Sequence, residues 1–295
     1  MKKLLLILLC LPMIGFGQQT YVPDAYFEGY LEAFGMGNGI PNDEYVTTAN
    51  INTIATLDVS FLNITDLTGI EDFTALVFLD CSLNQLDSLD VSQNNELNIL
   101  WCEGNQLTSL NISSNLALTN LSCGDNQLTS LNVSENSNLT WLACWNNQLT
   151  SLDVSANSLL DNLGVEYNLL TSLDVSQNNM LSYLACGANQ LTFLDLRNGN
   201  NINTILWSVN NPSLTCINVD DSVWATNNWT VSNLSIDSQQ YFSNNCSSTT
   251  SINEHAKHSQ LLKVTDLLGR ETKGTNQLLF YIYDDGTVEK KIVVE

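Results

Sequence analysis

The stretch that decides the fold reads LNILWCEGNQLTSLNISSNLA over residues 97–117, and LTNLSCGDNQLTSLNVSENSN follows it over residues 118–138. The two 21-residue strings share their apolar positions, one cysteine and several asparagines. The same pattern runs from Leu76 to Asn210 without a gap. Self-similarity at a fixed period of this length is typical of stacked coils, in which each unit buries its apolar edge only against its neighbours. The sequence therefore predicts a solenoid.

The repeat puts one residue type at one position of every coil. The cysteine position holds Cys81, Cys102, Cys123, Cys144 and Cys186, with Val165 and Trp207 in the two remaining coils. The asparagine position holds Asn84, Asn105, Asn126, Asn147, Asn168, Asn189 and Asn210. The leading apolar columns are Leu76, Leu97, Leu118, Leu139, Leu160, Leu181 and Ile202, and Leu79, Leu100, Leu121, Leu142, Leu163, Leu184 and Ile205. We expect these leucines to fill the interior, and the inward asparagine amides to bond the backbone of their own turn and of the next coil.

The cysteine column has two interpretations. Five thiols at regular spacing suggest metal binding, but each stands at the inward end of an apolar run, where Val165 replaces it without other change. A free cysteine behaves as a small buried apolar side chain. We therefore expect the column to be structural, and we expect no metal and no cofactor.

The charge of the chain excludes several functions. The formal net charge is -22, and between Gln18 and Thr250 the single cation Arg197 stands against 24 acids. Such a surface repels phosphate backbones, so nucleic acid is not an expected partner. Both histidines, His255 and His258, lie in the tail. This excludes a Ser-His-Asp or Cys-His pair and a His-ligated metal from the repeats.

The first residues have the composition of a secretory signal. Two lysines precede the apolar run from Leu4 to Leu11, and small residues up to Gly17 supply a cleavage site. The run is too short to span a bilayer, so we expect export without membrane insertion. Lipidation at Cys10 is an alternative, which the following Leu11 and Pro12 disfavour.

Residues 18–56 depart from the repeat. Pro23 and Asp24 start a helix, in which Phe27, Tyr30, Leu31 and Phe34 recur at i, i+3, i+4 and i+7. Because a solenoid needs its first coil covered, we interpret this helix as a cap.

At the other end of the repeats, Cys216 and Cys246 flank a segment rich in aromatic residues. We interpret this segment as a C-terminal cap closed by a Cys216–Cys246 disulfide, since an exported chain meets oxidising conditions. Two unpaired thiols are the alternative.

The repeat pattern L-x-x-L-x-C-x-x-N-x-L-x-x-L-x-V-S-x-N resembles the leucine-rich repeat of secreted bacterial proteins, in its 21-residue form. The resemblance covers about half of the chain. It implies a leucine-rich repeat solenoid with a parallel β-sheet on one face and short strands or irregular turns on the other. It also implies a protein that binds proteins or glycans and is not an enzyme.

The tail resembles the type A C-terminal sorting signal of type IX secretion in Bacteroidetes. Three apolar runs with turns between them predict a small C-terminal β module. The matching positions are Asp266, Gly269, Arg270, Gly286, Lys290 and Lys291. The tail lacks the upstream Tyr-Pro-Asn-Pro segment of that family. The resemblance implies the type IX machinery as a partner and a location outside the cell, either released or at the outer surface.

Aromatic side chains recur at outward positions beside the L-x-x-L-x-C strand. The outward positions hold Phe78, Ile99, Trp101, Trp141, Trp145, Tyr167, Tyr183 and Leu206, flanked by Asn120, Asp125, Asn146, Asn162 and Glu166. Exposed aromatic patches often mark binding surfaces. The candidate ligand-binding residues are Phe78, Trp101, Trp141, Trp145, Tyr167 and Tyr183. The alternative is that these rings stack on one another and stiffen the sheet.

A second column carries short polar side chains. It holds Asp90, Asn111, Asn132, Asp153, Asp174 and Asp195. Stacked carboxylates suggest calcium, but no D-x-D-x-D-G loop accompanies them, so we interpret them as solvated surface acids. A carboxylate-only glycosidase, with a pair such as Asp125 and Glu166, is the one enzyme compatible with this composition. No catalytic residue is selected by the spacing.

The expected protein is a secreted or cell-surface recognition protein that binds an extracellular protein or glycan through the sheet face. A structural surface or spacer protein without a specific ligand is the alternative. The expected segments are a signal peptide (1–17), an N-terminal helical cap (18–56), leucine-rich repeats (57–211), a C-terminal cap (212–246), a linker (247–252) and a C-terminal sorting signal (253–295).

Overall fold

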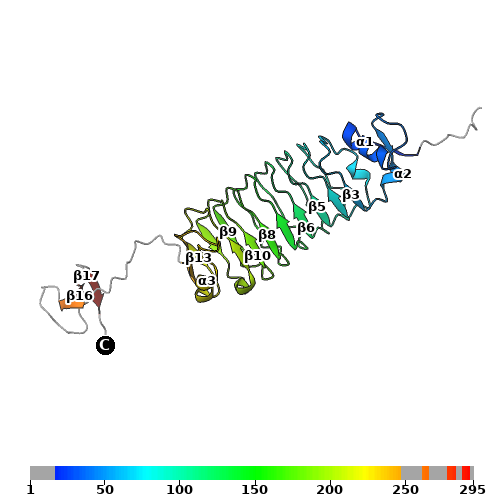
Figure 1. Ribbon diagram of the computed structural model, residues 1–295. Coiled ribbons are helices and arrows are strands. Elements are labelled where there is room, and N and C mark those ends of the chain that lie inside the picture. Colours follow the sequence, from blue (N-terminus) through cyan, green and yellow to red (C-terminus); the bar gives the residue numbers. More distant parts are fainter. Residues whose placement is uncertain (1–16, 247–260, 266–277, 284–287, 293–295) are drawn as a thin grey trace, which may run out of the picture. The chain divides into compact units, whose positions relative to one another are not determined.

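The computed structural model describes residues 17–246, 261–265, 278–283 and 288–292 of the 295-residue chain. It divides into two compact units, Met1–Cys246 and Ser247–Glu295. The first unit is a row of stacked coils, and helices stand at its two ends (Figure 1). Apart from Gly17, the predicted signal peptide lies outside the described residues.

One long parallel sheet runs the length of the repeats. Its eight strands lie in the order β12-β10-β8-β7-β6-β5-β4-β3. They are β3 (Thr56–Asp58), β4 (Phe78–Asp80), β5 (Ile99–Trp101), β6 (Asn120–Ser122), β7 (Trp141–Ala143), β8 (Asn162–Gly164), β10 (Tyr183–Ala185) and β12 (Ile205–Trp207). Each strand is three residues long, because the turn residues of the repeat begin directly after it. This is the parallel-sheet solenoid that the repeat predicts.

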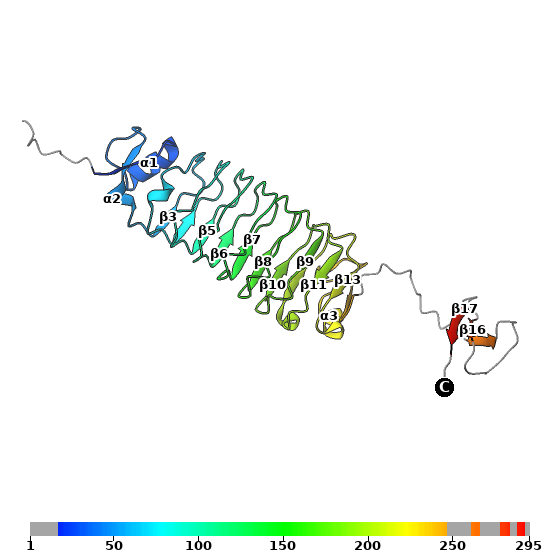
Figure 2. The same ribbon diagram turned by 180° about the vertical axis from the view of Figure 1, so that it is seen from behind.

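The second extended run of each coil forms a sheet only toward the C-terminal end. Its four strands lie in the order β14-β13-β11-β9 and are visible from behind in Figure 2. They are β9 (Ser172–Asp174), β11 (Phe193–Asp195), β13 (Cys216–Asn218) and β14 (Tyr241–Ser243). In the earlier coils the same position makes one isolated bridge, between Asp90 and Asn111. The second face is therefore partly strand and partly irregular turn.

The middle residue of each strand points into the coil. Strand neighbours place Leu79 beside Leu100 and Leu100 beside Leu121, and all three leucines are completely buried. The cysteine column is buried as well, and its members Cys81, Cys102, Cys123, Cys144 and Cys186 are free thiols. The leucine columns thus form one continuous interior, as predicted.

The inward asparagines tie each coil to its neighbour. Asn105 donates from Nδ2 to the carbonyl oxygens of Cys81 and Cys102, at 3.0 and 3.1 Å, and its Oδ1 accepts from the amide of Leu86 at 3.0 Å. The same contacts recur at Asn126 and Asn147. The prediction was wrong on one point, since the neighbour that is bonded is the preceding coil rather than the next.

The first coil is one residue longer than the 21-residue repeat, because Leu57 pairs with Leu79 at a separation of 22 residues. The last coil is also one residue longer, and there the 21-residue prediction was wrong. Leu184 pairs with Leu206 instead of Ile205. Ser208 takes the buried position beside Cys186 that was expected for Trp207.

In this longer last coil, the inward asparagine also stands one residue later than expected. Asn211, in place of Asn210, donates to the carbonyl oxygens of Cys186 and Ser208. Ile202 and Ile205, which were expected inside, are 56% and 65% exposed. The extra residue is accommodated in the 3₁₀ turn η2 (Asn201–Asn203).

At the N-terminal end, helix α1 (Ala25–Ala33) lies against the first coil. Its N-cap Asp24 accepts from the amides of Tyr26 and Phe27 and also from Thr65 in that coil. Phe27 is buried and stacks on Phe73, with ring centroids 6.2 Å apart. Near it lie an antiparallel pair and two short helices, β1 (Gln19–Tyr21), β2 (Tyr45–Thr47), α2 (Thr48–Ile51) and η1 (Ile70–Asp72). The assignment of residues 18–56 as a cap stays a prediction.

At the C-terminal end, the predicted disulfide between Cys216 and Cys246 is present, with the Cα atoms 5.9 Å apart. It joins β13 to the residue three positions beyond β14. Helix α3 (Ser222–Asn228) leads to Trp229, which is buried and donates from Nε1 to the carbonyl oxygen of Thr204 at 3.2 Å. This segment is thus held by covalent and aromatic contacts.

The second unit holds an antiparallel three-stranded sheet, in the order β15-β16-β17. The strands are β15 (Leu261–Thr265), β16 (Leu278–Tyr283) and β17 (Val288–Ile292), and they coincide with the three apolar runs. Of the sorting-signal residues, Lys290 and Lys291 lie on β17, while Asp266, Gly269, Arg270 and Gly286 lie outside the described residues. Across the part of the chain that is described, no helix has both the length and the apolar character needed to span a bilayer.

Candidate ligand-binding face of the long sheet

The outward face of the long sheet carries two columns, the first and the third residue of each strand. Side chains alternate along a strand, so both columns point away from the leucine interior. The first column holds Thr56, Phe78, Ile99, Asn120, Trp141, Asn162, Tyr183 and Ile205, and the third holds Asp58, Asp80, Trp101, Ser122, Ala143, Gly164, Ala185 and Trp207. We call these columns, together with the second and third residues after each strand, the sheet face.

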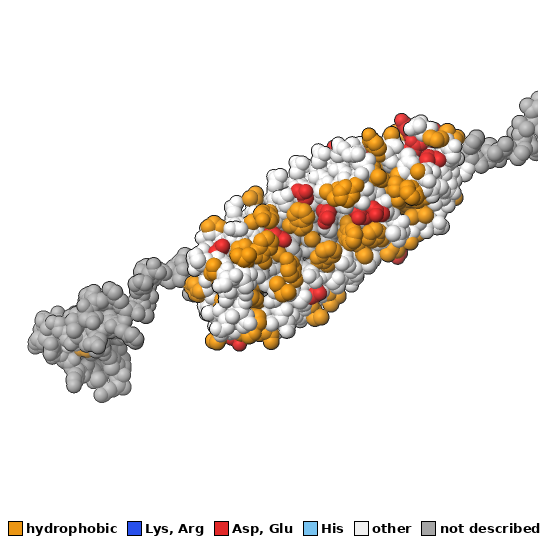
Figure 3. All heavy atoms as spheres, in the orientation of Figure 1, with side chains coloured by type: hydrophobic (Ala, Val, Ile, Leu, Met, Phe, Trp, Pro, Cys, Tyr) orange, Lys and Arg blue, Asp and Glu red, His pale blue; other side chains and the backbone are white. Residues whose placement is uncertain are grey.

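The six predicted binding residues all reach the surface of the sheet face. Tyr167 and Tyr183 are 54% and 37% exposed, whereas Phe78, Trp101, Trp141 and Trp145 are partly buried. Leu206 was also predicted to point outward, and this was wrong, because the shifted register of the last coil buries it to 2% exposure. In Figure 3, orange side chains lie across this face with red acids among them and no blue.

The rings fall into two groups. Phe78 and Trp101 contact each other edge to face, with centroids 5.2 Å apart. The indole Nε1 of Trp101 is buried and has no hydrogen-bond partner among the described residues. This pair therefore fits the stacking alternative better than the binding one. Trp141, Trp145, Tyr167 and Tyr183 lie on the later coils, and none of them stacks on another described ring.

Trp145 lies over the preceding coil instead of projecting from its own. A Cβ added at Gly124 would meet the Trp145 indole at 2.5 Å, so the ring occupies the space that any other residue at 124 would fill. Gly164 makes room in the same way for Glu166, whose Oε2 would lie 3.1 Å from a Cβ there. The two glycines thus decide the directions of one ring and one carboxylate.

A shallow hollow of about 560 Å³ lies beside two rings of the second group, Trp141 and Tyr183. It is lined by Asn120, Thr140, Trp141, Asp161, Asn162 and Tyr183. Asp161 accepts from Ser182 Oγ and from Asn162 Nδ2, the latter at 2.9 Å. The sequence indicated Trp141 and Tyr183 as ligand-binding and Asn120 and Asn162 as flanking residues. It missed Thr140 and Asp161, which precede β7 and β8 and share a polar column with Asn98, Thr119 and Ser182.

Glu166 is a half-buried acid of the sheet face. Its Oε2 is buried and has no hydrogen-bond partner in the described part of the chain. Burial raises the pKa of the Glu166 carboxyl. Burial first, and then the negative charge of Glu166, raises the pKa of the Tyr183 phenol.

The glycosidase pair is not supported by these positions. Asp125 accepts from Asn146 Nδ2 at 2.6 Å, and Glu166 lies over Gly164. The two acids belong to coils that are two strand spacings apart, so their backbones are separated by about 10 Å. Paired glycosidase carboxyl groups stand about 5–9.5 Å apart, and Asp125 is already bonded within the face.

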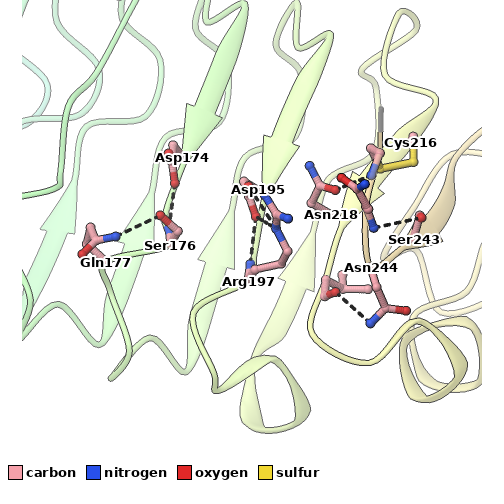
Figure 4. Close-up of polar contacts among 12 residues, drawn as sticks. Asp174, Ser176, Gln177, Asp195, Arg197, Cys216, Asn218, Ser243 and Asn244 are labelled. Carbon is pink, nitrogen blue, oxygen red and sulfur yellow. Dashed lines mark hydrogen bonds and ion pairs between the residues drawn. A yellow bond between two sulfur atoms is a disulfide. The ribbon is translucent and has the colours of Figure 1, made fainter. Parts of the chain in front are cut away.

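The side chains of the column from Asp90 to Asp195 hold the turns that follow them through hydrogen bonds to the backbone. Each member accepts the backbone amide of the residue two positions later, as Ser176 donates to Asp174 at 2.9 Å (Figure 4). Asp195 is buried to 4% exposure and pairs with Arg197, so the interpretation as solvated acids was wrong for this residue. Within the described ranges, no group of three or more His, Cys, Asp or Glu side chains is arranged to hold a metal ion.

The cysteine column is inert in this structure. All five thiols are completely buried, and burial raises their pKa well above the ordinary value. A thiolate is the form that binds metals and reacts. The column therefore acts as part of the apolar interior.

No protein-family model matches the chain, and no curated protein matches it. The chain does match solved structures. The functional domain of InlJ from Listeria monocytogenes, which includes a cysteine ladder, is 33% identical over 69% of this chain and 52% of that one, with a TM-score of 0.55. A leucine-rich repeat protein of Leptospira interrogans is 22% identical over 59% of this chain and 52% of that one, with a TM-score of 0.50. The internalin InlF of L. monocytogenes is 18% identical over 75% of this chain and 68% of that one, with a TM-score of 0.51.

These comparisons show that the fold is that of a leucine-rich repeat solenoid. The chain spans about half the length of the first two structures that it matches. The cysteine ladder of InlJ is a feature that this chain shares, in the column from Cys81 to Cys186.

Proposed function

We propose that this protein is an extracellular recognition protein, which captures a protein ligand through the sheet face around Trp141 and Tyr183. The observation that carries the proposal is the hollow between these two side chains, which lies on a rigid parallel sheet. Aromatic rings held on a preorganised surface provide large contact area at a small entropic cost. The likeness to InlJ and InlF, both leucine-rich repeat proteins, supports a binding role rather than an enzymatic one.

Export is part of the proposal. The secretory signal at residues 1–17 and the sorting signal at residues 253–295 support passage out of the cell by the type IX route of Bacteroidetes. The Cys216–Cys246 disulfide supports an oxidising location. Fusing residues 253–295 to a reporter protein in a strain with an active type IX system tests this directly. We expect secretion of the reporter, and its retention when Gly269 and Arg270 are replaced by alanine.

The binding proposal is tested by a display screen with a matched control. The purified protein is screened against displayed peptides and a glycan array, and hits are measured again with Trp141→Ala combined with Tyr183→Ala. The control combines Leu159→Ala with Met180→Ala, which removes two exposed apolar side chains that lie outside the sheet face. We expect the first variant to lose binding and the second to keep it.

The second candidate function is a spacer protein without a ligand. The edge-to-face pair of Phe78 and Trp101 favours it locally, because these rings satisfy each other. A screen without any hit supports the spacer function and contradicts the proposed one. Hits that bind both variants equally strongly contradict both functions, because a ligand is then bound outside the proposed site.

A further inference from the structure

Two aromatic side chains stand on either side of a short polar one on the sheet face. Trp141 on β7 and Tyr183 on β10 both pair in register with Asn162 on β8, which lies between them. Neighbouring strands are about 4.8 Å apart, so the two rings rise from backbones roughly 10 Å apart. This gap admits one extended side chain above Asn162, with a ring on each side.

Acids stand at both ends of the same central strand. Asp161 immediately precedes β8 and lines the hollow. Glu166 follows two positions after β8, and its carboxylate turns back over Gly164 because that residue has no Cβ. A side chain that lies along β8 between the rings therefore ends near a carboxylate in either direction.

Among the described residues, no ion pair joins a carboxylate of the sheet face to a lysine or arginine. The ion pair among the described residues joins Arg197 to Asp195, and Asp195 belongs to β11 of the other sheet. Glu166 has one buried oxygen without a hydrogen-bond donor, an arrangement that a positive ligand would relieve. The view in Figure 3 shows acids among aromatic side chains on this face, and no lysine or arginine.

We infer that the sheet face binds its protein partner through a lysine or arginine side chain, whose stem lies between Trp141 and Tyr183 and whose charge meets Glu166. Asp161, at the other end of the strand, already accepts hydrogen bonds from Ser182 and Asn162. The inference rests on the proposed function and names the chemistry of its ligand. Aromatic faces attract cations, and carboxylates form charge-assisted hydrogen bonds with them. A neutral sugar would leave the charge of Glu166 without a counter-charge.

The probe is octa-arginine, and octa-citrulline is the neutral peptide of nearly the same shape. Binding of each peptide to the full chain is measured by titration calorimetry. The variants are Glu166→Gln and Trp141→Ala, and the control is Glu135→Gln, which removes an exposed acid outside the sheet face. Thermal melting of each variant establishes that it is folded.

We expect octa-arginine to bind and octa-citrulline to bind at least tenfold more weakly. Glu166→Gln and Trp141→Ala should each weaken octa-arginine about tenfold, since each removes an interaction worth about one hydrogen bond to a charge or one cation–π contact. Glu135→Gln should change the affinity less than about twofold, because it changes only the diffuse attraction of an acidic protein.

Equal effects of Glu135→Gln and Glu166→Gln would overturn the inference, as would equal binding of the two peptides or no binding of octa-arginine. The screen described above separates this failure from that of the proposed function. A neutral glycan whose capture needs Trp141 but not Glu166 overturns the cation site and leaves recognition through the sheet face standing. Absence of any capture that depends on Trp141 overturns both.

Discussion

The inward asparagine ladder carries a quantitative prediction for Asn126→Ala. Asn126 lies in the middle of the repeats, is 9% exposed, and donates from Nδ2 to the carbonyl oxygens of Cys102 and Cys123 at 3.0 and 3.2 Å. Its Oδ1 accepts from the amide of Leu107 at 3.0 Å. Among the described residues, the Leu107 amide has no other hydrogen-bond acceptor, so the substitution leaves a buried donor without a partner.

The magnitude follows from what each partner retains. The carbonyl of Cys102 keeps Asn105 Nδ2 as a donor, and the carbonyl of Cys123 keeps Asn147 Nδ2. The carbonyl of Gly124, to which Asn126 Nδ2 also donates at 3.0 Å, keeps the backbone amide of Gly104. The backbone amide of Leu107 is left without a hydrogen-bond acceptor among the described residues. An orphaned buried amide costs about 1–3 kcal/mol, and each lost hydrogen bond to a satisfied carbonyl contributes about 0.5–1 kcal/mol. We expect Asn126→Ala to lower the free energy of unfolding by about 2–4 kcal/mol.

Asn136→Ala is the matched comparison, taken from a second column of fully buried asparagines that comprises Asn94, Asn115, Asn136, Asn157 and Asn178. Asn136 is fully buried and donates to the carbonyl oxygens of Ile112 and Asn115, but its Oδ1 has no donor in the described structure. Its removal orphans no amide, so it should cost at least about 1 kcal/mol less than Asn126→Ala.

The assay is urea unfolding of both variants, followed by circular dichroism, with hydrogen exchange at the Leu107 amide as a local readout. Asn126→Ala should lower the midpoint more and speed exchange at Leu107. Equal destabilisation by the two substitutions, or unchanged protection of Leu107, would refute the reasoning.

Three further predictions concern the sheet face, the cysteines and the N-terminal helix. Gly124→Ala should displace the Trp145 indole, shift its fluorescence and destabilise the protein by about 1–3 kcal/mol, because the added Cβ meets the ring at 2.5 Å. In protein without residues 1–17, which carry Cys10, the native state should expose no thiol to a labelling reagent and the denatured state five, and reducing the Cys216–Cys246 disulfide should lower stability by about 3–4 kcal/mol in the chain-entropy model. Burial raises the pKa of Asp24, but hydrogen bonds from Thr65 and Phe27 outweigh it and leave this pKa below the ordinary 3.8. Asp24 therefore stabilises the fold above that pH and loses this effect as the pH falls through its folded-state pKa, so Asp24→Asn should cost more at pH 6 than at pH 3.

Each of these has an internal control. Gly29→Ala in α1 meets no atom within 4 Å, so it should stabilise the protein slightly, and a loss as large as that of Gly124→Ala would contradict the account. Labelled thiols in the native state would place a cysteine outside the interior. An equal cost of Asp24→Asn at both pH values would mean that its carboxylate does not hold Thr65 in solution.

The interior was well predicted from the sequence because the same physical requirement acts at the same position of every coil. Leucine recurs at the positions of Leu79, Leu100 and Leu121 because every coil must fill the same interior space. Asparagine recurs at the position of Asn105 because every turn has the same backbone carbonyl groups that need a hydrogen-bond donor. The longer last coil could not be predicted from this pattern. Ile205 and Leu206 are both apolar, so the choice between them depends on where η2 absorbs the extra residue.

The sheet face was harder to predict for a different reason. The direction of a surface side chain depends on the size of the residue beneath it, in its own coil or in the preceding one, and this cannot be read from its own column. Trp145 lies over the preceding coil because that coil has Gly124, and Glu166 turns back because β8 ends in Gly164. The contribution of Asp161 to the hollow follows from its neighbours as well, since it stands beside Trp141 and Tyr183 only once the strands are in register.

Hydroxyl-radical footprinting of the protein with a captured ligand tests the central claim most directly. The account predicts that the ligand protects Trp141, Tyr167 and Tyr183 from oxidation, while Met180 and Leu159 remain as reactive as in the free protein. Protection of Met180 and Leu159 with unchanged reactivity of the three rings would contradict it, because the ligand would then occupy the turns and leave the sheet uncovered.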